Sequence, residues 1–171
     1  MLSPAFKDEH EQVDPKELRE VLGCFATGVV VVTTLGEAGA PVGLTVSSFN
    51  SVSLHPPLVL WSISLKAPSL TAFRRHDHFA INILAAGQRD LCMRFAKPAA
   101  DKFAEVAYEA GVGGVPLLHD AAAHLECRTV ARYPGGDHEI YVGHVLSLKS
   151  FDRDPIVFHR GAFRELLPLD E

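Results

Sequence analysis

Apolar and polar residues alternate with a period of two along much of the chain, and this pattern predicts strands. Four ranges, 29–34, 42–46, 58–64 and 79–84, are rich in β-branched or aromatic residues and are bounded by Gly, Pro or polar turns. Further on, 123–133 and 138–151 alternate in the same way, with Ile140, Val142, Leu146 and Leu148 on one side of the second range. Turn residues at 36–41, 134–137 and 160–161 predict hairpins between neighbouring strands.

Helical spacing is confined to three short segments. Asp14 can cap a helix that starts at Pro15, and apolar residues recur at helical spacing from Leu18 to Phe25. Ser69 opens a second short helix, and 87–96 predicts a third. Because helices do not alternate with strands and no G-x-G-x-x-G follows a strand, a doubly wound nucleotide-binding sheet is disfavoured. We predict a mainly β fold: an antiparallel, Greek-key-like barrel with helical decorations.

Length and composition fit one globular domain. The chain has 171 residues, of which 47% are hydrophobic, and the Gly- and Pro-rich stretch at 109–118 does not divide it convincingly. We expect a flexible N-terminal segment over 1–13 and a single domain over 14–171.

Charge and cysteine content exclude several classes of function. With 16 Lys and Arg against 21 Asp and Glu, the net charge of -5 does not favour binding to nucleic acid or to an anionic membrane. Neither a signal peptide nor a membrane-spanning apolar run is visible, so we expect a cytoplasmic protein. Three widely spaced cysteines, at 24, 92 and 127, favour free and mostly buried thiols over disulfides.

Metal and hydrolase chemistry find no support in the motifs. The nine histidines never fall at metal-ligand spacing with one another or with cysteines, and we expect no metal. The nucleophile motif G-x-S-x-G is also absent.

The most unusual feature is a cluster of hydroxyls beside an apolar strand. Thr45, Ser47 and Ser48 precede the strand at 58–64, and a buried hydroxyl without a partner costs about 1–3 kcal/mol. Downstream, more hydroxyls and a lysine gather near the start of the second predicted helix, where they favour binding of an anionic group. A solvated turn whose Ser69 caps the helix explains the same residues.

Several motifs, in this order, resemble the short-chain flavin reductase family. They are ATGVVVVTT, GLTVSSFNSVSLHPPLVLWSI, FAINILAAGQRDLCMRFA, DKF, VPLLHDAAAHLEC and GGDHEIYVGHV, and the likeness runs from about residue 18 to 166. The resemblance implies an FMN-binding split barrel. It also implies an NAD(P)H:flavin oxidoreductase that uses NADH or NADPH to reduce FMN or FAD, with reduced flavin passing to a separate monooxygenase, and a homodimer.

The resemblance also implies which residues form the site. It places Thr45, Val46, Ser47 and Ser48 along the flavin ring edge, Ser62, Ser64, Lys66, Ser69 and Thr71 near the ribityl phosphate, and Asn82, Leu84, Phe95, Lys102 and Phe103 around the pocket. In the Gly136–His138 turn, Asp137 precedes His138, which would position nicotinamide against the flavin. Arg160 would approach the flavin or a dimer partner.

Some alternatives remain open at this stage. Flavin bound permanently could pass electrons to another acceptor, and the same barrel could be a non-catalytic flavin- or haem-binding module. Phe95 could be a core residue, and a hairpin turn alone explains the Gly136–His138 motif. An NADPH preference would need a cation for the 2′-phosphate, for which the candidates are Arg74, Arg75, Arg132 and Arg153.

Overall fold

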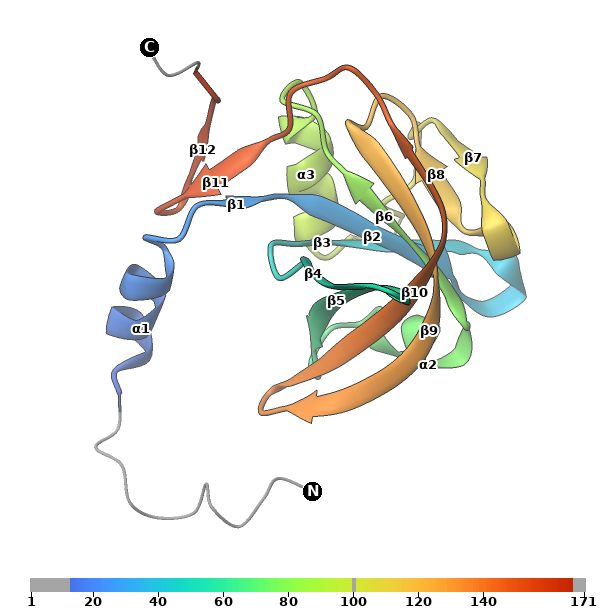
Figure 1. Cartoon of the computed structure of the whole chain (residues 1–171), viewed down its shortest axis with the longest axis horizontal. Coiled ribbons are helices and arrows are strands. Elements are labelled where there is room, and N and C mark those ends of the chain that lie inside the picture. The colour runs from blue at the N-terminus through green and yellow to red at the C-terminus, as the bar shows by residue number, and fades with distance from the viewer. Residues whose placement is uncertain (1–12, 100, 168–171) are drawn as a thin grey trace.

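A seven-stranded antiparallel sheet forms the body of the molecule. The computed structural model describes residues 13–99 and 101–167, so the predicted flexible segment lies almost wholly outside the described residues. The strand order is β3-β2-β6-β9-β10-β5-β4, and the sheet curls into a barrel (Figure 1). Its strands are β2 (Val30–Leu35), β3 (Pro41–Val46), β4 (Asn50–Leu54), β5 (Pro57–Ser64), β6 (His78–Ile83), β9 (Ala123–Gly135) and β10 (His138–Ser150). The end strands β3 and β4 are not paired with each other, so the barrel is split, and the antiparallel barrel prediction is confirmed.

Three short helices and two small sheets decorate this barrel. The helices are α1 (Pro15–Leu22), α2 (Leu70–Arg75) and α3 (Arg89–Ala96), with 3₁₀ turns η2 (Glu37–Gly39) and η3 (Val112–Gly114). One small sheet joins β1 (Thr27–Gly28), β11 (Val157–His159) and β12 (Ala162–Arg164), and the other joins β7 (Tyr108–Ala110) to β8 (Pro116–Leu118). All three predicted helices are confirmed, whereas β1, β4, β7 and β8 were missed. None of the helices in the described ranges is long and apolar enough to cross a membrane.

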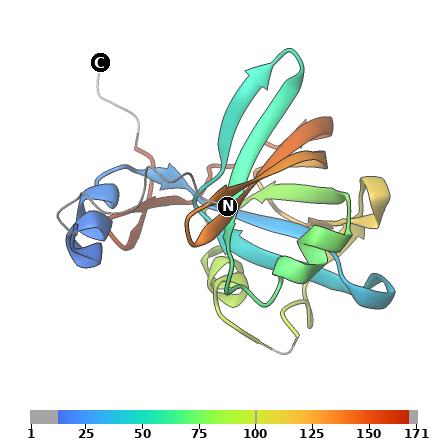
Figure 2. The same ribbon diagram turned by 90° about the horizontal axis from the view of Figure 1, so that it is seen from below.

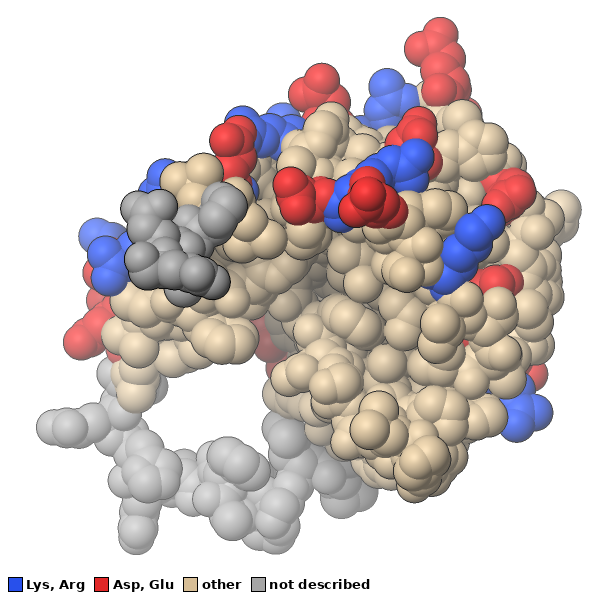
Figure 3. All heavy atoms as spheres, turned by 45° about the horizontal axis from the view of Figure 1, so that its top comes forward, with Lys and Arg blue, Asp and Glu red and all other residues tan. Residues whose placement is uncertain are grey.

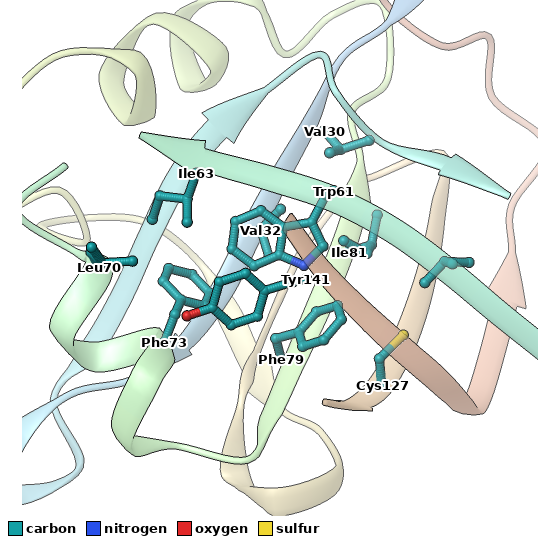
Figure 4. Close-up of a cluster of buried hydrophobic side chains, with 11 residues drawn as sticks. Val30, Val32, Trp61, Ile63, Leu70, Phe73, Phe79, Ile81, Cys127 and Tyr141 are labelled. Carbon is teal, nitrogen blue, oxygen red and sulfur yellow. The ribbon is translucent and has the colours of Figure 1, made fainter. Parts of the chain in front are cut away.

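Aromatic side chains fill the inside of the barrel (Figure 4). Trp61 of β5 stacks on Tyr141 of β10 with ring centroids 4.8 Å apart, and Phe73 and Phe79 contact Trp61 edge-on. All four rings are buried, and burying each contributes about 1.5–3 kcal/mol. The ring of Phe79 fits here because position 143 is glycine: a Cβ there would lie 2.3 Å from Cζ of Phe79. A second apolar cluster packs α3 against the other side of β2.

The exposed and buried sides of β10 differ from the prediction. The register shifts between Val142 and Gly143 and again between Val145 and Ser147. Because these irregularities interrupt the alternation, Ile140, Val142, Leu146 and Leu148 do not form one buried face. The buried positions are Tyr141 and Gly143, and Leu148 is 71% exposed.

Candidate active site

A cleft of about 450 Å³ opens beside β3, the strand at one edge of the large sheet. One wall is β3, another is the loop from β5 to α2, and the third is the end of α3 with the segment that follows it. Five predicted site residues line this cleft: Thr45, Ser69, Phe95, Lys102 and Phe103. The structure therefore brings these five sequence-distant residues to one cleft.

The hydroxyls next to the cleft have protein partners. Thr45 Oγ1 donates to the carbonyl of Cys92 at 2.7 Å, which ties β3 to α3. Ser48 Oγ accepts from the N–H of Ser62 at 3.0 Å and donates to its carbonyl at 3.2 Å, which ties the loop after β3 to β5. These two hydroxyls therefore join β3 to α3 and the loop after β3 to β5, and each donates to a protein carbonyl.

The backbone of the same loop provides free donors instead. Within the described part of the chain, the N–H groups of Ser47 and Ser48 form no hydrogen bond. The side chain of Val46 is partly buried and packs against the barrel core. The loop thus presents amide donors beside Thr45.

Lys102 brings a half-buried cation to the cleft. Its ammonium group donates to the carbonyl of Phe95 at 2.8 Å and lies 3.4 Å from the carbonyl of Gly43. No carboxylate lies within ion-pair distance of it in the described ranges, because neighbouring Asp101 accepts from the N–H groups of Phe103 and Ala104. Burial lowers the pKa of Lys102.

The loop leading to α2 supplies further polar groups. Ser64 Oγ accepts from the N–H of Lys66 at 3.2 Å. Ser69 stands at the N-cap position, but its side chain makes no capping hydrogen bond, so the proposed capping role is wrong. Thr71 is exposed on α2. The hydroxyl of Ser69 therefore has no structural role that competes with binding.

The predicted Gly136–His138 turn lies beside the start of the β5–α2 loop, where β5 ends. His138 begins β10 opposite Ser64, and the N–H of Leu65 donates to the carbonyl of Asp137 at 2.9 Å. His138 Nδ1 lies 2.7 Å from Asp137 Oδ1. This hydrogen bond lowers the pKa of Asp137, and Lys66 acts in the same direction. The His138 side chain is 43% exposed, so its outer side is open to solvent.

Asn82, Leu84 and Arg160 lie away from the cleft and from the loops beside it. Asn82 is fully buried and donates to Val31 O and Thr33 Oγ1, while its Oδ1 accepts from Leu118 N. Leu84 is equally buried in the cluster under α3. Neither lines the cleft, and every polar atom of the Asn82 side chain has a partner. The sequence placed both on a strand near the pocket, but their side chains lie in the core.

Arg160 belongs to a different part of the molecule. It is in the turn between β11 and β12, its N–H donates to Gly23 O at 2.9 Å, and Nη2 lies 3.4 Å from Sγ of Cys24. The hollow beside it, of about 690 Å³, is lined mostly by α1 and shares no residue with the cleft.

Sequence reasoning missed Gly43, Ala67, Pro68 and Pro98 among the lining residues. Gly43 interrupts a β-branched strand, which is a signal for close approach of another group. A Cβ at this position would lie 2.8 Å from Cε1 of Phe95. The described ranges contain no cluster of three or more potential metal-ligating residues.

Comparison with known proteins shows the family to which the chain belongs. The flavin reductase like domain family matches residues 22–167, so the chain belongs to the flavin reductase-like family. Among its relatives, the NADH-dependent FAD reductase of Streptomyces globisporus is 40% identical over 176 residues, covering 98% of this chain and 96% of the relative. The monooxygenase reductase subunit HsaB of Rhodococcus jostii is 38% identical, with 92% and 81% covered.

Solved structures share the fold. The S. globisporus NADH:FAD oxidoreductase SgcE6, in complex with NAD and FAD fragments, superposes with a TM-score of 0.85 at 41% identity, covering 93% of this chain and 98% of that one. Other relatives are longer: the chain spans 65% of the stachydrine N-demethylase reductase subunit Stc3 and 49% of a probable flavin reductase, both from Rhizobium meliloti.

Proposed function

We propose that the protein is an NAD(P)H-dependent flavin reductase that supplies reduced flavin to a separate monooxygenase. The observation that carries the proposal is the cleft lined by Thr45 and by Lys102, whose ammonium group has carbonyl partners but no carboxylate within ion-pair distance in the described ranges. The amides of Ser47 and Ser48 follow Thr45 along the chain, and the Gly136–His138 turn lies beyond the β5–α2 loop. The family match and the relatives named as flavin reductases support it.

The residues of the cleft fit FMN or FAD. Its volume lies in the range of about 300–1,000 Å³ that is usual for small-molecule sites. The amides of Ser47 and Ser48 would hold the polar edge of the ring. Phe103 would face its apolar part, and the fully buried Phe95 would support Phe103 from the core. Lys102, Ser69, Ser64 and Lys66 would hold anionic groups, since cations and hydroxyls bind phosphate well.

Once bound, flavin would accept a hydride from the nicotinamide and carry the electrons away. This transfer needs no general acid or base from the protein, but it needs the two rings held about 3–3.5 Å apart. His138 would position the nicotinamide, and Asp137 would fix the orientation of its imidazole through the 2.7 Å contact. The amides of Ser47 and Ser48 would stabilise the negative charge that develops at the ring edge.

We propose NADH as the preferred donor. Of the four arginines that could bind a 2′-phosphate, Arg74, Arg75 and Arg153 are paired with Glu139, Glu37 and Asp120. Relatives named as NADH-dependent support this preference.

We also propose a homodimer, a transient monooxygenase partner and a cytoplasmic location. Relatives named as reductase components of monooxygenases support the partner. The three cysteines form no disulfide, which fits a reducing compartment. The exposed apolar side chains of α1 support the dimer.

The test is oxidation of NADH and NADPH by purified protein under air, with and without added FMN or FAD, followed by loss of nicotinamide absorbance. Turnover that depends on added flavin and is faster with NADH is expected. If flavin stays bound during gel filtration and the nicotinamide is oxidised only when another electron acceptor is added, the result would support the prosthetic-group alternative. Absence of turnover with either nucleotide would overturn the proposed activity.

A further inference from the structure

The side chain of His138 has little support of its own. In the described ranges its hydrogen bond is to Asp137, and the Asp137 side chain is itself 87% exposed. Two glycines precede this pair: Gly135 is a cross-strand partner of His138, and Gly136 has a positive φ of 69°. Glycine leaves the backbone of a turn mobile unless other contacts restrain it. The placement of His138 therefore depends on what holds the first residues of β10 to the barrel.

Glu139, the next residue of β10, is held by two nitrogens of one arginine. Arg74 Nε donates to both carboxylate oxygens of Glu139 at 3.2 Å, and Nη2 donates to Oε2 at 2.7 Å. Contacts through two nitrogens of a planar guanidinium fix direction as well as distance. The hydrogen bond from Arg74 lowers the pKa of Glu139 although burial acts the other way, so both partners are charged at neutral pH.

The carboxylate of this pair is much less exposed than those of the other ion pairs in residues 13–99 and 101–167. The Glu139 side chain is 14% exposed, whereas the side chains of Glu37 and Asp120 are 86% and 78% exposed. Figure 3 shows charged side chains of both signs side by side on the surface of the molecule. Exposed pairs of that kind contribute little. A carboxylate that water hardly reaches depends on its partner, because water cannot replace the lost hydrogen bonds.

Arg74 stands on a helix that is anchored in the barrel core. Phe73, its neighbour on α2, is buried and contacts Trp61 and Tyr141, with ring centroids 4.9 and 6.3 Å apart. Arg132 of β9 adds a hydrogen bond of 3.4 Å from Nη1 to the carbonyl of Arg74. Figures 1 and 2 show α2 at the same end of the barrel as the β9–β10 turn. The ion pair thus joins the start of β10 to a fixed part of the molecule.

The strand transmits this restraint to His138. Glu139 pairs with the buried Ile63 and His138 pairs with Ser64, so Glu139 lies on the same side of the sheet as Ile63. Neighbouring residues of a strand point to opposite faces. Fixing Glu139 on the side of α2 therefore sets the backbone from which His138 points to the other side.

We propose that Arg74 and Glu139 are positioning residues for the nicotinamide, because their ion pair holds the start of β10 and thereby the orientation of His138. This inference rests on the proposed function, in which His138 meets the nicotinamide. The same helix follows the loop that carries Ser64 and Ser69, the proposed ligands of anionic groups of the flavin. One short helix thus supports the sites of both ligands.

A double-mutant cycle tests the role of the pair, with a matched control on the same helix. Arg74→Gln, Glu139→Gln and the double variant are compared with Arg75→Gln, which breaks the exposed ion pair between Arg75 and Glu37. In either glutamine variant of the first pair, kcat/KM for NADH should fall about fivefold to tenfold, mainly through KM. The double variant should lose no more than either single one. KM for flavin should stay within about twofold of wild type, and Arg75→Gln should change neither KM.

Hydrogen exchange, followed by mass spectrometry, gives a readout that does not depend on turnover. The backbone amides of 134–139 should exchange faster in Glu139→Gln than in wild type, and at the wild-type rate in Arg75→Gln. Emission of the buried Trp61 checks that the barrel core is intact in each variant. Arg74→Lys keeps the charge but not the planar fork, so it should fall between wild type and Arg74→Gln in both measurements. It also serves as the test if a glutamine variant fails to fold.

Three results would overturn the positioning role. The first is an additive loss in the double variant, and the second is an equal rise of KM for NADH and flavin. The third is lower stability in urea with unchanged kinetics and unchanged exchange at 134–139, which would show that the ion pair only supports the fold. The proposed function fails separately: wild-type protein without flavin-dependent NADH oxidation would refute it, while faster exchange at 134–139 in Glu139→Gln would still show that the pair holds the turn.

Discussion

Replacing Gly43 by alanine tests the construction of the cleft wall. The new Cβ would lie 2.8 and 2.9 Å from Cε1 and Cδ1 of Phe95 and 3.4 Å from Cζ of Phe103. Phe95 is fully buried and contacts Phe103 edge-on, with centroids 4.9 Å apart, so its ring cannot retreat into the core. Either α3 moves away from β3 or the ring rotates toward the cleft.

The expected cost follows from overpacking. Forcing an extra methyl group into a packed site costs about 1–3 kcal/mol, and the lower chain entropy of alanine in the unfolded state returns about 0.4–1 kcal/mol. We therefore expect the free energy of unfolding to fall by about 1–2 kcal/mol, and flavin affinity to fall by about tenfold as the wall shifts.

Urea unfolding and flavin fluorescence titration measure the two effects. Gly28→Ala is the matched control, since a Cβ there has no neighbour within 4 Å. It should leave flavin affinity unchanged and should not lower the free energy of unfolding, which the lower chain entropy of alanine can raise by about 0.4–1 kcal/mol. Phe95→Leu in the Gly43→Ala background should recover part of the loss, because a smaller side chain makes room. Stability and flavin affinity equal to wild type in Gly43→Ala would refute the close contact between β3 and α3.

Three further substitutions separate structural from functional roles. Asn82→Ala leaves the Leu118 N–H without a partner, and we expect a loss of about 2–4 kcal/mol in urea unfolding; wild-type stability would contradict the buried network. His138→Ala should raise KM for NADH more than for flavin, and equal changes would refute nicotinamide positioning. Burial raises the pKa of Tyr141 from 10.0 to about 12. The stabilisation that its neutral hydroxyl gives the folded state is therefore complete below pH 10 and is lost as the pH rises toward 12. Tyr141→Phe should reduce this alkaline loss of stability, measured by urea unfolding at each pH.

Most elements of the fold could be predicted because their signals are local. Strands such as β2 and β6 are short apolar runs, and Pro15 and Asp14 mark the start of α1. β4 was not predicted because its sequence, NSVSL, is rich in serine and only partly apolar. The exposed face of β10 could not be predicted, since the two register shifts depend on pairing with β9.

The site was predictable only in outline. The motifs brought Thr45, Ser69 and Lys102 to one cleft, but they could not show which hydroxyls the protein satisfies internally. Thr45 finds its acceptor on α3, 47 positions away, and Asn82 finds Leu118 N 36 positions away. Such pairings arise from tertiary packing, so a polar residue on a strand near the pocket can belong wholly to the core.

The stacked pair of Trp61 and Tyr141 gives the protein a spectroscopic reporter of its own. The chain has one tryptophan, and Trp61 is fully buried among aromatic rings on the inner side of β5. Its emission therefore arises from one defined environment and should shift to the red when the barrel opens. Because oxidised flavin absorbs where tryptophan emits, energy transfer from Trp61 would follow occupancy of the cleft without any added label.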